Sequence, residues 1–565
     1  MTERLVASAE LMPVLELLKG NVLEERINTL AEIADGGKIG EGGSRLALTS
    51  TEISARKCLI RWMEEAGMRV EEFPLGLIGT YEGLNPTLPG IGFGSHFDTV
   101  PSGGRYDGTA GVVAAIEVVK ALQKNRRRCK RPLKVFAMTG EESSRFGTAL
   151  FGSQGIFLGL SDNVLNMHRP EDISIRQALE NFGFDPEQVR LPVVTKDSLR
   201  AFLELHVEQH SLLDHEGMDV AAVEAIAAPD RRIITIGQPL AEVVKEVSNV
   251  TKGIRIDIMG KGGHSGALPM GREYRADGLQ PAANFLMVLP AAFDRIFKNK
   301  NIKIFITDLQ IEGAALNKVP GNTHLEIMLS GENEKDLEEA EVFILTYLKK
   351  LNRYYGPEKD HWPRFITNPL SASKLVEKQL PSKYHFEPEQ LLPCFKTAGK
   401  IIQAVNQICT RYDTRKIVGT IGTFHLRSDG LIDLGLDLRG IDKGLRDQVA
   451  EEINKQIDQI SLRERVNTRI SEPLPGSESP TIMDSQLVNN IEQLALSLGL
   501  KVRRMHSAAG HDAQNAARAG IPTGMIFIPS RNEGRSHVPE EYSAPEDLEN
   551  GARLLATTVY KLANE

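Results

Sequence analysis

The sequence predicts an α/β protein whose mixed sheet is interrupted by an inserted α+β domain. Strand patterns alternate with helical periodicity between residues 1 and 248, and again between 471 and 565, which is typical of a parallel or mixed sheet with helices on both faces. Residues 249–470 instead show half-exposed strands in the order strand, helix, strand, strand, helix. Because this order fits a ferredoxin-like layer, we expect a separate domain here.

The composition bounds the class of protein. A chain of 565 residues is long enough for two or more domains, and 41% hydrophobic with 25% charged residues is typical of a globular protein. The net charge of −8 gives no reason to expect nucleic acid. Four scattered cysteines suit a reducing cytosol. Neither a signal peptide nor an apolar run of ~20 residues is evident, so we expect a cytoplasmic protein without a membrane span.

The sheet domain is expected in two parts. Helical periodicity covers residues 13–34 and 51–66, and a strand follows at 69–73. Apolar runs then predict strands that end near residues 93, 138, 209 and 530, and a helix at 111–122 follows the first of them. After a loop-like segment at 472–480, helices and strands resume at 485–498, 501–505, 511–519, 523–529 and 546–563.

The inserted domain shows an order of elements that recurs. Its first part has strands at 253–259, 302–311 and 323–329 and helices at 273–298 and 334–351, and its second has strands at 364–367, 416–426 and 431–438 and helices at 388–412 and 445–460. The closest internal match sets Leu325–Gly331 against Leu434–Gly440. This predicts a tandem duplication with units at 249–355 and 360–470, although two similar units can also arise by chance. Residues 352–388 have no clear assignment.

Polar side chains of metal-ligand type follow four predicted strands. His96 and Asp98 end the first strand, and Asp107 lies in a Gly-rich loop before a helix. The other three strands lead to Glu141-Glu142, His206 and His537. Open α/β sheets bind ligands at the carboxyl ends of their strands. A single loop Asp or His is usually a turn residue, but four coincidences of ligand type favour a metal site.

The sequence resembles a known family of metallohydrolases. It is similar to the zinc aminoacylase/carboxypeptidase-like metallohydrolases, in the hydantoinase–carbamoylase branch, which includes N-carbamoyl-L-amino acid hydrolases, β-alanine synthase and allantoate amidohydrolase. The matching motifs span residues 90–540: Gly94-Ser-His-Phe-Asp-Thr-Val-Pro-Ser-Gly-Gly-Arg-Tyr-Asp-Gly108, Glu141-Glu-Ser-Ser-Arg-Phe-Gly147, Glu204-Leu-His-Val-Glu-Gln209, Gly263-His-Ser-Gly-Ala-Leu-Pro-Met270, Asn317-Lys-Val-Pro-Gly321, Gly510-His-Asp-Ala-Gln514 and Ser536-His-Val-Pro-Glu540. The resemblance implies a di-metal hydrolase domain and a ferredoxin-like lid domain.

The resemblance also implies a set of metal ligands. His96 and His206 would bind one metal, Glu142 and His537 the other, and Asp107 would bridge the two. Two divalent ions per subunit are expected, Zn²⁺ or alternatively Mn²⁺, Co²⁺ or Ni²⁺. Asp98 would orient the His96 imidazole from outside the ligand set. The two metals would hold a water between them and make hydroxide available at neutral pH.

Further residues resemble the catalytic and substrate groups of the family. Glu141 would be the general base, the bland alternative being a solvated glutamate. His264 would stabilise the oxyanion, although a lone His in such a loop is more often a turn residue. The side chains expected to contact substrate are Gln209, Asn317 and His511. The arginine that pairs with a substrate carboxylate is replaced by Ser330 at the family's usual position, so Arg439 is the candidate.

Other departures affect the expected assembly and activity. His210 and Ala267-Leu268 replace the family's usual residues, and the lid is longer than a single copy. In this branch the lid often dimerises, so a duplicated lid favours a monomer and a single lid a homodimer. The expected activity is hydrolysis of a C–N bond in N-carbamoyl-L-amino acids or allantoate-type ureido acids. A dipeptidase or aminoacylase of the same superfamily is the alternative, and an inactive binding protein is disfavoured because every ligand and the base are present.

Overall fold

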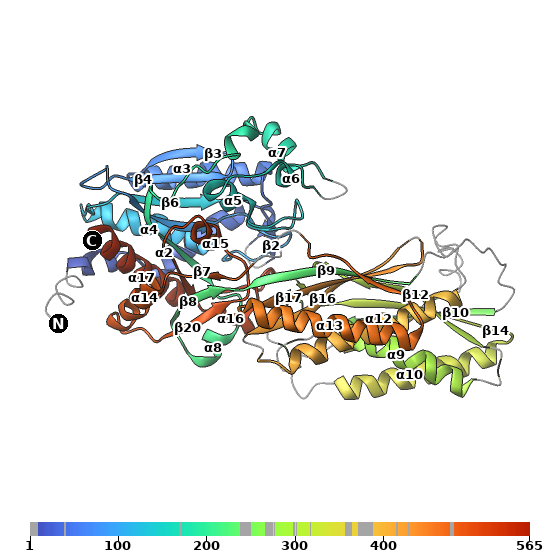
Figure 1. The fold of residues 1–565 in the computed structure, drawn as a ribbon. Coiled ribbons are helices and arrows are strands. Elements are labelled where there is room, and N and C mark those ends of the chain that lie inside the picture. Colours follow the sequence, from blue (N-terminus) through green and yellow to red (C-terminus); the bar gives the residue numbers. More distant parts are fainter. Residues whose placement is uncertain are drawn as a thin grey trace. The chain divides into compact units, whose positions relative to one another are not determined.

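The computed structural model describes residues 10–38, 41–168, 172–237, 250–260, 262–265, 270, 275, 277–297, 300, 302–316, 318–355, 364–370, 388–413, 416–427, 429–474 and 479–565. The chain forms two compact units (Figure 1): Met1–Ala227 with Ser479–Glu565, here called the sheet unit, and Ala228–Glu478, here called the insert unit. The sequence analysis divided the chain at 248/249 and 470/471 instead. The first division lies earlier because β9 (Ala228–Ile236) pairs with strands of the insert unit.

The sheet unit is built on a nine-stranded mixed sheet, which confirms the predicted mixed α/β architecture. Its strands follow the order β19-β8-β21-β7-β5-β6-β4-β3, and β20 pairs with β8. Their bounds are β3 Arg69–Phe73, β4 Gly76–Tyr81, β5 Gly90–His96, β6 Leu133–Met138, β7 Leu199–Val207, β8 Val220–Ile226, β19 Thr481–Ile482, β20 Val502–Ser507 and β21 Thr523–Ile528. β5 and β21 are buried along their whole length, as expected for central parallel strands.

Helices and a small hairpin complete the sheet unit. α4 (Thr109–Lys124) and α17 (Pro545–Asn564) pack on the central strands, and α2 (Gly20–Glu32) packs against both helices. β1 (Asp35–Lys38) and β2 (Gly42–Ser44) form a separate two-stranded sheet. The remaining elements are α3 Ser50–Glu65, α5 Phe151–Phe157, α6 Asp162–Leu165, α7 Ile175–Asn181, η1 Pro186–Val189, α8 Leu212–Glu216, α14 Ser485–Ser497, α15 Ala513–Arg518 and α16 Arg531–Gly534.

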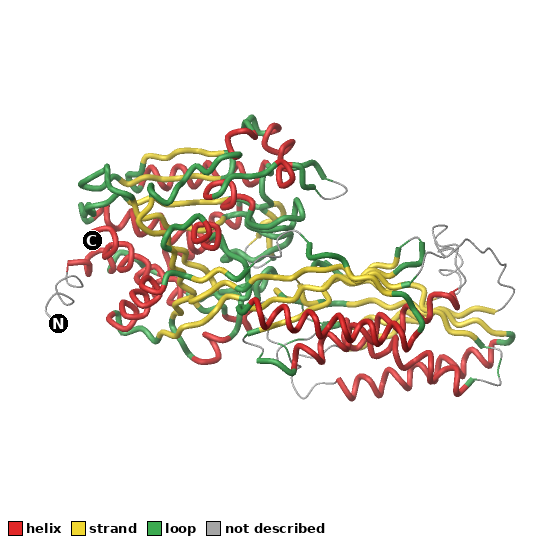
Figure 2. The backbone as a smooth tube through the Cα atoms, in the orientation of Figure 1, coloured by secondary structure: helices red, strands yellow, loops and turns green. Residues whose placement is uncertain are grey.

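In its described residues, the insert unit has two four-stranded antiparallel sheets and the four long helices α9, α10, α12 and α13 (Figure 2). The first sheet has the order β12-β14-β10-β15, and the second has the order β16-β17-β9-β18. The strands are β10 Val250–Met259, β12 Lys303–Ile311, β14 Thr323–Gly331, β15 Arg364–Leu370, β16 Ile417–Leu426, β17 Ile432–Gly440 and β18 Thr468–Ile470. The helices are α9 Leu279–Ile296, α10 Glu334–Tyr355, α12 Pro388–Thr410 and α13 Lys443–Glu464, and β11 (Gly263–His264) pairs with β13 (Lys318–Val319).

The two sheets of the insert unit have the same strand order but are nested rather than consecutive. In each, the first, second, third and fourth strands along the chain lie in the spatial order 2-3-1-4. The sequence analysis assigned residues 364–367 to the start of a second unit. The structure instead pairs β15 with β10, which closes the first sheet. The first strand of the second sheet is β9, which precedes every strand of the first sheet in the chain. The strands of the first sheet, β10 to β15, are therefore inserted in the chain between β9 and β16 of the second sheet.

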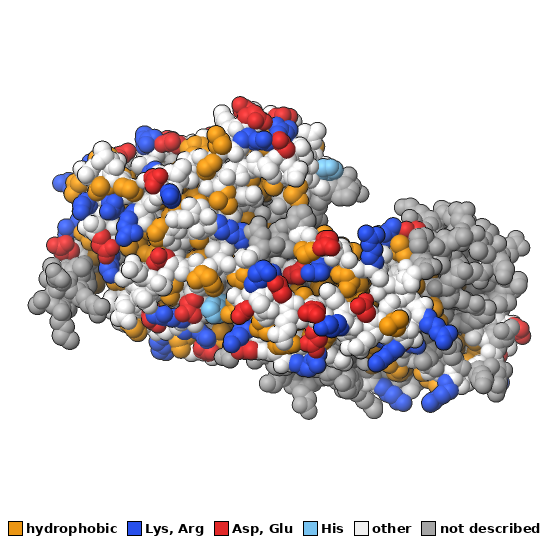
Figure 3. All heavy atoms as spheres, viewed as in Figure 1, with side chains coloured by type: hydrophobic (Ala, Val, Ile, Leu, Met, Phe, Trp, Pro, Cys, Tyr) orange, Lys and Arg blue, Asp and Glu red, His pale blue; other side chains and the backbone are white. Residues whose placement is uncertain are grey.

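Each unit has its own hydrophobic core, and the insert unit shares one core between both of its sheets. α9 packs against α12, and the edge strands β12 and β16 lie against each other. On the face shown in Figure 3, Lys and Arg side chains are interspersed with Asp and Glu. Among the described helices, none is both long and apolar enough to cross a membrane.

Candidate metal centre

Four neighbouring parallel strands end at the candidate site. β21, β7, β5 and β6 are adjacent in this order and point in the same direction, so their carboxyl ends meet at one edge of the sheet. Each strand or the segment after it delivers a side chain predicted to bind metal: His537, His206, His96 and Glu142. Asp107 reaches the same place from the loop that precedes α4. The structure therefore brings together all five predicted ligands.

The imidazoles of His96 and His206 face one oxygen of Asp107. Their Nε2 atoms lie 3.4 Å and 3.1 Å from Asp107 Oδ1, and 3.4 Å from each other. Nδ1 of His96 lies 3.1 Å from the backbone carbonyl oxygen of Asp98, and Nδ1 of His206 lies 2.8 Å from that of Val207. Because a carbonyl oxygen only accepts, Nδ1 carries a hydrogen in each ring, and Nε2 is the atom that would bind a metal once its own proton is lost.

The second oxygen of Asp107 lies in a different cluster of side chains, with His537 and Glu142. His537 Nε2 lies 3.2 Å from Asp107 Oδ2 and 3.2 Å from Glu142 Oε1. The sets His96–Asp107–His206 and Asp107–Glu142–His537 each bring three ligand atoms within 4.8 Å of one another. Asp107 is common to both sets and offers one oxygen to each, as a bridging carboxylate does.

These residues fit two divalent cations. Lone pairs and carboxylate oxygens converge in a buried place, which is unfavourable unless positive charge lies between them. When two ligand atoms each lie about 2.0–2.1 Å from a tetrahedral metal ion, the two ligand atoms are about 3.3 Å apart. The distances of 3.1–3.4 Å within the first group match this value. Imidazole and carboxylate ligands suit Zn²⁺ and the other divalent transition metals.

The charges of the site also favour bound cations. Burial opposes the charged form of Asp107, but hydrogen bonds from His206, His537 and His96 hold its pKa well below the ordinary value. Burial opposes the charged form of His96 as well. The hydrogen bond to Asp107 and the charges of nearby carboxylates nevertheless raise the pKa of His96 well above its ordinary value. Both shifts mean that the carboxylates here are stabilised by positive charge.

Glu141 lies beside the first group but belongs to neither ligand set. Its Oε2 is 3.9 Å from His96 Nε2. Burial raises the pKa of Glu141 well above its ordinary value, against the effect of His96 and together with that of Glu142. The backbone N–H groups of Glu141 and Glu142 donate to the two carboxylate oxygens of Asp98, at 3.3 Å and 3.2 Å. Asp98 thus fixes the turn that carries both glutamates, and its Oδ1 is 3.7 Å from His96 Nδ1.

Two predicted substrate groups also lie at this edge of the sheet. The Gln209 side chain donates to Asp107 Oδ2 at 2.7 Å, and its own carbonyl oxygen is buried and has no hydrogen-bond partner among the described residues. Gln209 has a φ of 58° and His537 a φ of 63°, and such strained backbone at non-glycine residues concentrates at functional sites. The His511 ring lies 4.5 Å from that of His206, and its Nε2 lies 2.8 Å from Ser507 Oγ.

The remaining predicted groups belong to the insert unit. Arg439, 3% exposed, lies in β17 and donates from Nε to Asp437 Oδ2 at 3.0 Å. Ser265, which follows His264, donates to the same Asp437 oxygen at 2.6 Å. Asp437 therefore connects Arg439 to the turn that carries His264. Asn317 lies outside the described residues, but the next residue, Lys318, pairs with His264 between β11 and β13.

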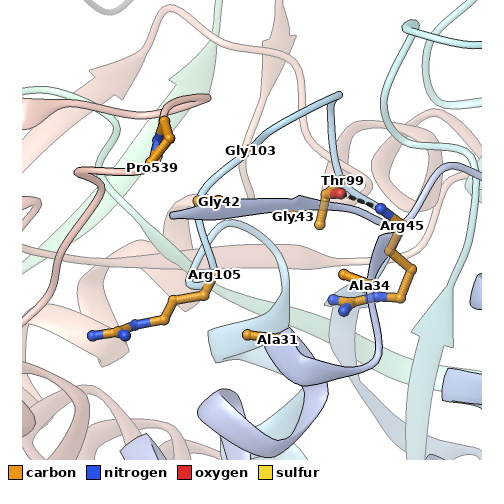
Figure 4. A pocket seen from close by; sticks show the side chains of 10 residues that line it. Ala31, Ala34, Gly42, Gly43, Arg45, Thr99, Gly103, Arg105 and Pro539 are labelled. Atoms are coloured by element: carbon orange, nitrogen blue, oxygen red, sulfur yellow. Dashed lines mark hydrogen bonds between the residues drawn. The ribbon is translucent and has the colours of Figure 1, made fainter. Parts of the chain in front are cut away.

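Arg45 also lies close to the ligands, and sequence reasoning did not single it out. Its side chain is 1% exposed and donates to Phe97 O at 2.7 Å, Leu30 O at 2.6 Å and Thr109 Oγ1 at 3.2 Å. Its backbone N–H donates to Thr99 Oγ1 at 2.8 Å (Figure 4). Phe97 follows His96 and Thr109 begins α4, so Arg45 ties together both ends of the loop that carries Asp107.

A mixed sheet that gathers histidine and carboxylate side chains at its strand ends has the arrangement expected of a metallohydrolase. The chain belongs to Peptidase family M20/M25/M40, whose model matches residues 92–561. It is 26% identical to the ureidoglycolate hydrolase of Arabidopsis thaliana, with 96% of this chain and 86% of the relative covered. It is also 26% identical to the N-carbamoyl-L-amino-acid amidohydrolase of Paenarthrobacter aurescens, with 94% and 96% covered.

Solved structures are similar over nearly the whole chain. A crystal structure of AtUAH in complex with glyoxylate shares 25% identity and a TM-score of 0.56, and covers 98% of this chain and 100% of its own. An amidase of the hydantoinase/carbamoylase family from Burkholderia multivorans shares 21% identity and a TM-score of 0.55, with 97% and 99% covered. The second likeness concerns the fold alone. Membership of this family, and the names of these similar relatives, agree with the resemblance found in the sequence.

Proposed function

We propose that this protein is a metal-dependent amidohydrolase that cleaves a C–N bond in a ureido acid, such as an N-carbamoyl-L-amino acid or an allantoate-type compound. The observation that carries the proposal is the pair of ligand sets that share Asp107, with Glu141 beside them. Relatives named for ureido substrates, each similar over more than nine-tenths of this chain, support the substrate class. For a carbamoyl amino acid, one water would yield the amino acid, ammonia and CO₂.

The ligand assignment follows the two groups of side chains. His96 and His206 would hold one divalent ion, Glu142 and His537 the other, and Asp107 both. When bound, such ions lower the pKa of water and polarise the substrate carbonyl. Zn²⁺ suits this ligand set, and Mn²⁺, Co²⁺ and Ni²⁺ are the alternatives.

The other side chains have roles around the reacting bond. Glu141 would accept a proton from the attacking water and return it to the leaving nitrogen. Within the described part of the chain, the buried carbonyl oxygen of Gln209 has no hydrogen-bond partner, which suits a ureido N–H donor. His264 would donate to the developing oxyanion and Arg439 would bind the substrate carboxylate, with Asn317 and His511 as further contacts. These roles require the insert unit to act as a lid.

The test of this function compares the wild type with Glu141→Gln. Ammonia release is measured on N-carbamoyl-L-amino acids, allantoate and ureidoglycolate, and amine release on dipeptides and N-acetyl amino acids, with added Zn²⁺ or Mn²⁺. We expect ammonia from the ureido acids, reduced roughly 10²- to 10⁴-fold in the variant because a general base is lost. The metal content of the variant should equal that of the wild type.

The outcomes separate the candidate functions. Amine from dipeptides or N-acetyl amino acids without ammonia from any ureido acid would assign the protein to the dipeptidase or aminoacylase alternative. No hydrolysis of any substrate by metal-loaded protein would favour an inactive binding protein. Equal ammonia release from wild type and variant would remove Glu141 from the role of base.

We also propose that the insert unit is a nested duplication and that the protein is a monomer. The shared strand order of the two sheets, and their common core, support the duplication. The edge strands β12 and β16 lie against each other within one chain, which leaves that edge covered without a second copy. A cytoplasmic location is proposed from the four cysteines, which are all free and buried.

A further inference from the structure

Glu541 is a buried carboxylate that none of the proposed steps uses. It is 4% exposed and lies four residues after His537. We propose that Glu541 is a positioning residue that fastens the loop of Asp107 to the segment of His537, so that these side chains can share their metal ions. The inference rests on the metal centre of the proposed function. It concerns how the centre is assembled, since Glu541 belongs to neither ligand set among the described residues.

The two oxygens of Glu541 bind two segments from opposite ends of the chain. Oε1 accepts the backbone N–H groups of Tyr106 at 2.7 Å and Asp107 at 2.9 Å. Oε2 accepts the Ser536 hydroxyl at 3.0 Å and the backbone N–H of His537 at 3.4 Å. Because both oxygens are directed at donors of the chain itself, the carboxylate holds loops and is turned away from a role as ligand.

Ser536 extends this connection to the shared ligand. Its Oγ lies 2.8 Å from Asp107 Oδ2 as well as 3.0 Å from Glu541 Oε2. Glu541 therefore acts on Asp107 from two sides, through its backbone N–H and through the hydroxyl beside its Oδ2. A shift of Glu541 would move the Oδ2 atom that both His537 and Gln209 contact.

A glycine in the neighbouring loop supports this arrangement independently. A Cβ added at Gly104 would lie 2.3 Å from Glu541 Cδ and 2.4 Å from its Oε1. No real Cβ approaches other atoms so closely, so the loop passes Glu541 only because residue 104 lacks a side chain. Gly104→Ala is thus a way to displace the carboxylate without changing its charge.

The experiment measures metal binding rather than turnover. Metal-free wild type, Glu541→Gln and Gly104→Ala are titrated with Co²⁺, and the visible absorption of the bound ion is followed together with thermal unfolding. We expect both variants to bind Co²⁺ about 10- to 100-fold more weakly, as for loss of other groups that orient metal ligands. Their Co²⁺ spectra should also differ from that of the wild type, because His537 and Asp107 no longer hold one geometry.

Glu208→Gln is the matched control. Glu208 is also 4% exposed, and its carboxylate also accepts two backbone N–H groups, from Leu212 at 3.1 Å and Leu213 at 3.0 Å. Those donors lie at the start of α8 and not in a ligand loop. The control should lose stability without losing Co²⁺ affinity or changing the spectrum.

Each result has a defined meaning. Unchanged Co²⁺ affinity and spectrum in both Glu541→Gln and Gly104→Ala would overturn the positioning role and leave the metal centre in place. An equal loss in Glu208→Gln would also overturn it, because the effect would then be one of general packing. If wild type itself bound no Co²⁺, the proposed centre and this inference would fall together. If Glu541→Gln does not fold, Gly104→Ala alone decides.

Discussion

At the scale of single residues, Gly108 lies where the loop of Asp107 turns into α4. Its backbone has φ 63° and ψ −48°, a conformation that only glycine adopts without strain. A Cβ added there would lie 2.4 Å from Nε2 of His96. Glycine is therefore required twice at this position, for the turn and for the space that the proposed ligand His96 occupies.

Gly108→Ala should weaken metal binding, and Gly217→Ala should not. Gly217 has a similar φ of 61°, but a Cβ there would meet nothing within 4 Å. Both variants should lose roughly 1–2 kcal/mol of unfolding free energy from backbone strain. Only Gly108→Ala should also lose about 10-fold or more in metal affinity, because its methyl group displaces His96.

Urea unfolding of the metal-free proteins and a metal titration measure the two effects separately. Equal metal affinity of the two alanine variants would contradict the reading that Gly108 makes room for His96.

Residue types at the strand ends predicted a metal site and the resemblance named its ligand set, but neither indicated the groups that hold those side chains in place. His96, Asp107 and His206 could be proposed as ligands because they follow strands of the sheet and match the motifs of the family. Glu541 and Arg45 bond mainly to backbone atoms, which every residue carries, so neither leaves a pattern of residue types. Arg439 was proposed to bind the substrate carboxylate because Ser330 occupies the usual position of the family's arginine. The structure adds that Arg439 donates a hydrogen bond to Asp437.

At the scale of elements, Arg45 joins three segments of the sheet unit at one point. Its guanidinium bonds to the last turn of α2 through Leu30 O, to the end of β5 through Phe97 O, and to the start of α4 through Thr109. No carboxylate is among its hydrogen-bond acceptors in the described residues. Its bonds therefore serve to fix the backbone around the ligand loop rather than to neutralise an acid.

Arg45→Met should destabilise the protein and also weaken metal binding. Buried carbonyl oxygens lose their donor, which costs about 1–3 kcal/mol for each group left without a partner. Arg56→Met is the matched control, since Arg56 is equally buried and bonds to Glu52, Phe73 O and Pro74 O. The control should lose as much stability or more, because a buried Glu52 remains unpaired.

Calorimetric metal titrations of both folded variants distinguish the two arginines. The affinity should fall in Arg45→Met alone. Loss of affinity in both variants would mean that any large destabilisation disturbs the centre.

The order of elements in the insert unit was predicted well, but their pairing was not. The strand at 253–259 was found from its alternation of apolar and polar residues, which reports burial of one face, and strands were also expected at 302–311, 323–329 and 416–426. Pairing partners depend on contacts across long sequence separations, and β15 pairs back to β10 rather than forward. β8 and β9, which are separated by a single residue, were both missed.

At the scale of the whole molecule, the insert unit holds two layers with the same strand order, one nested within the other along the chain. In the chain, the strands of the first layer, β10 to β15, come between β9, the first strand of the second layer, and α12. The two layers then bury a common core, to which α9 and α12 both contribute. Such a core links the two layers energetically, because neither layer can separate without exposing apolar surface.

The outer edges of the two layers are poor sites for a second copy. β15 carries Pro369, which has no backbone N–H, and β18 has only three residues. Short strands and proline are the usual means by which edge strands avoid pairing with other chains. The inner edges, β12 and β16, already lie against each other.

We therefore expect sedimentation velocity to give the mass of one 565-residue chain at micromolar concentration, with and without added metal. Pro369→Val should leave this mass unchanged, since the short edge β18 and the covered inner edges remain. Leu436→Asp on β17, which introduces a charge into the shared core, should cost several kcal/mol and unfold the insert unit as a whole. A dimer mass for the wild type that rises with concentration would contradict the monomer and would require that an outer edge or a helical face of the insert unit binds a second copy.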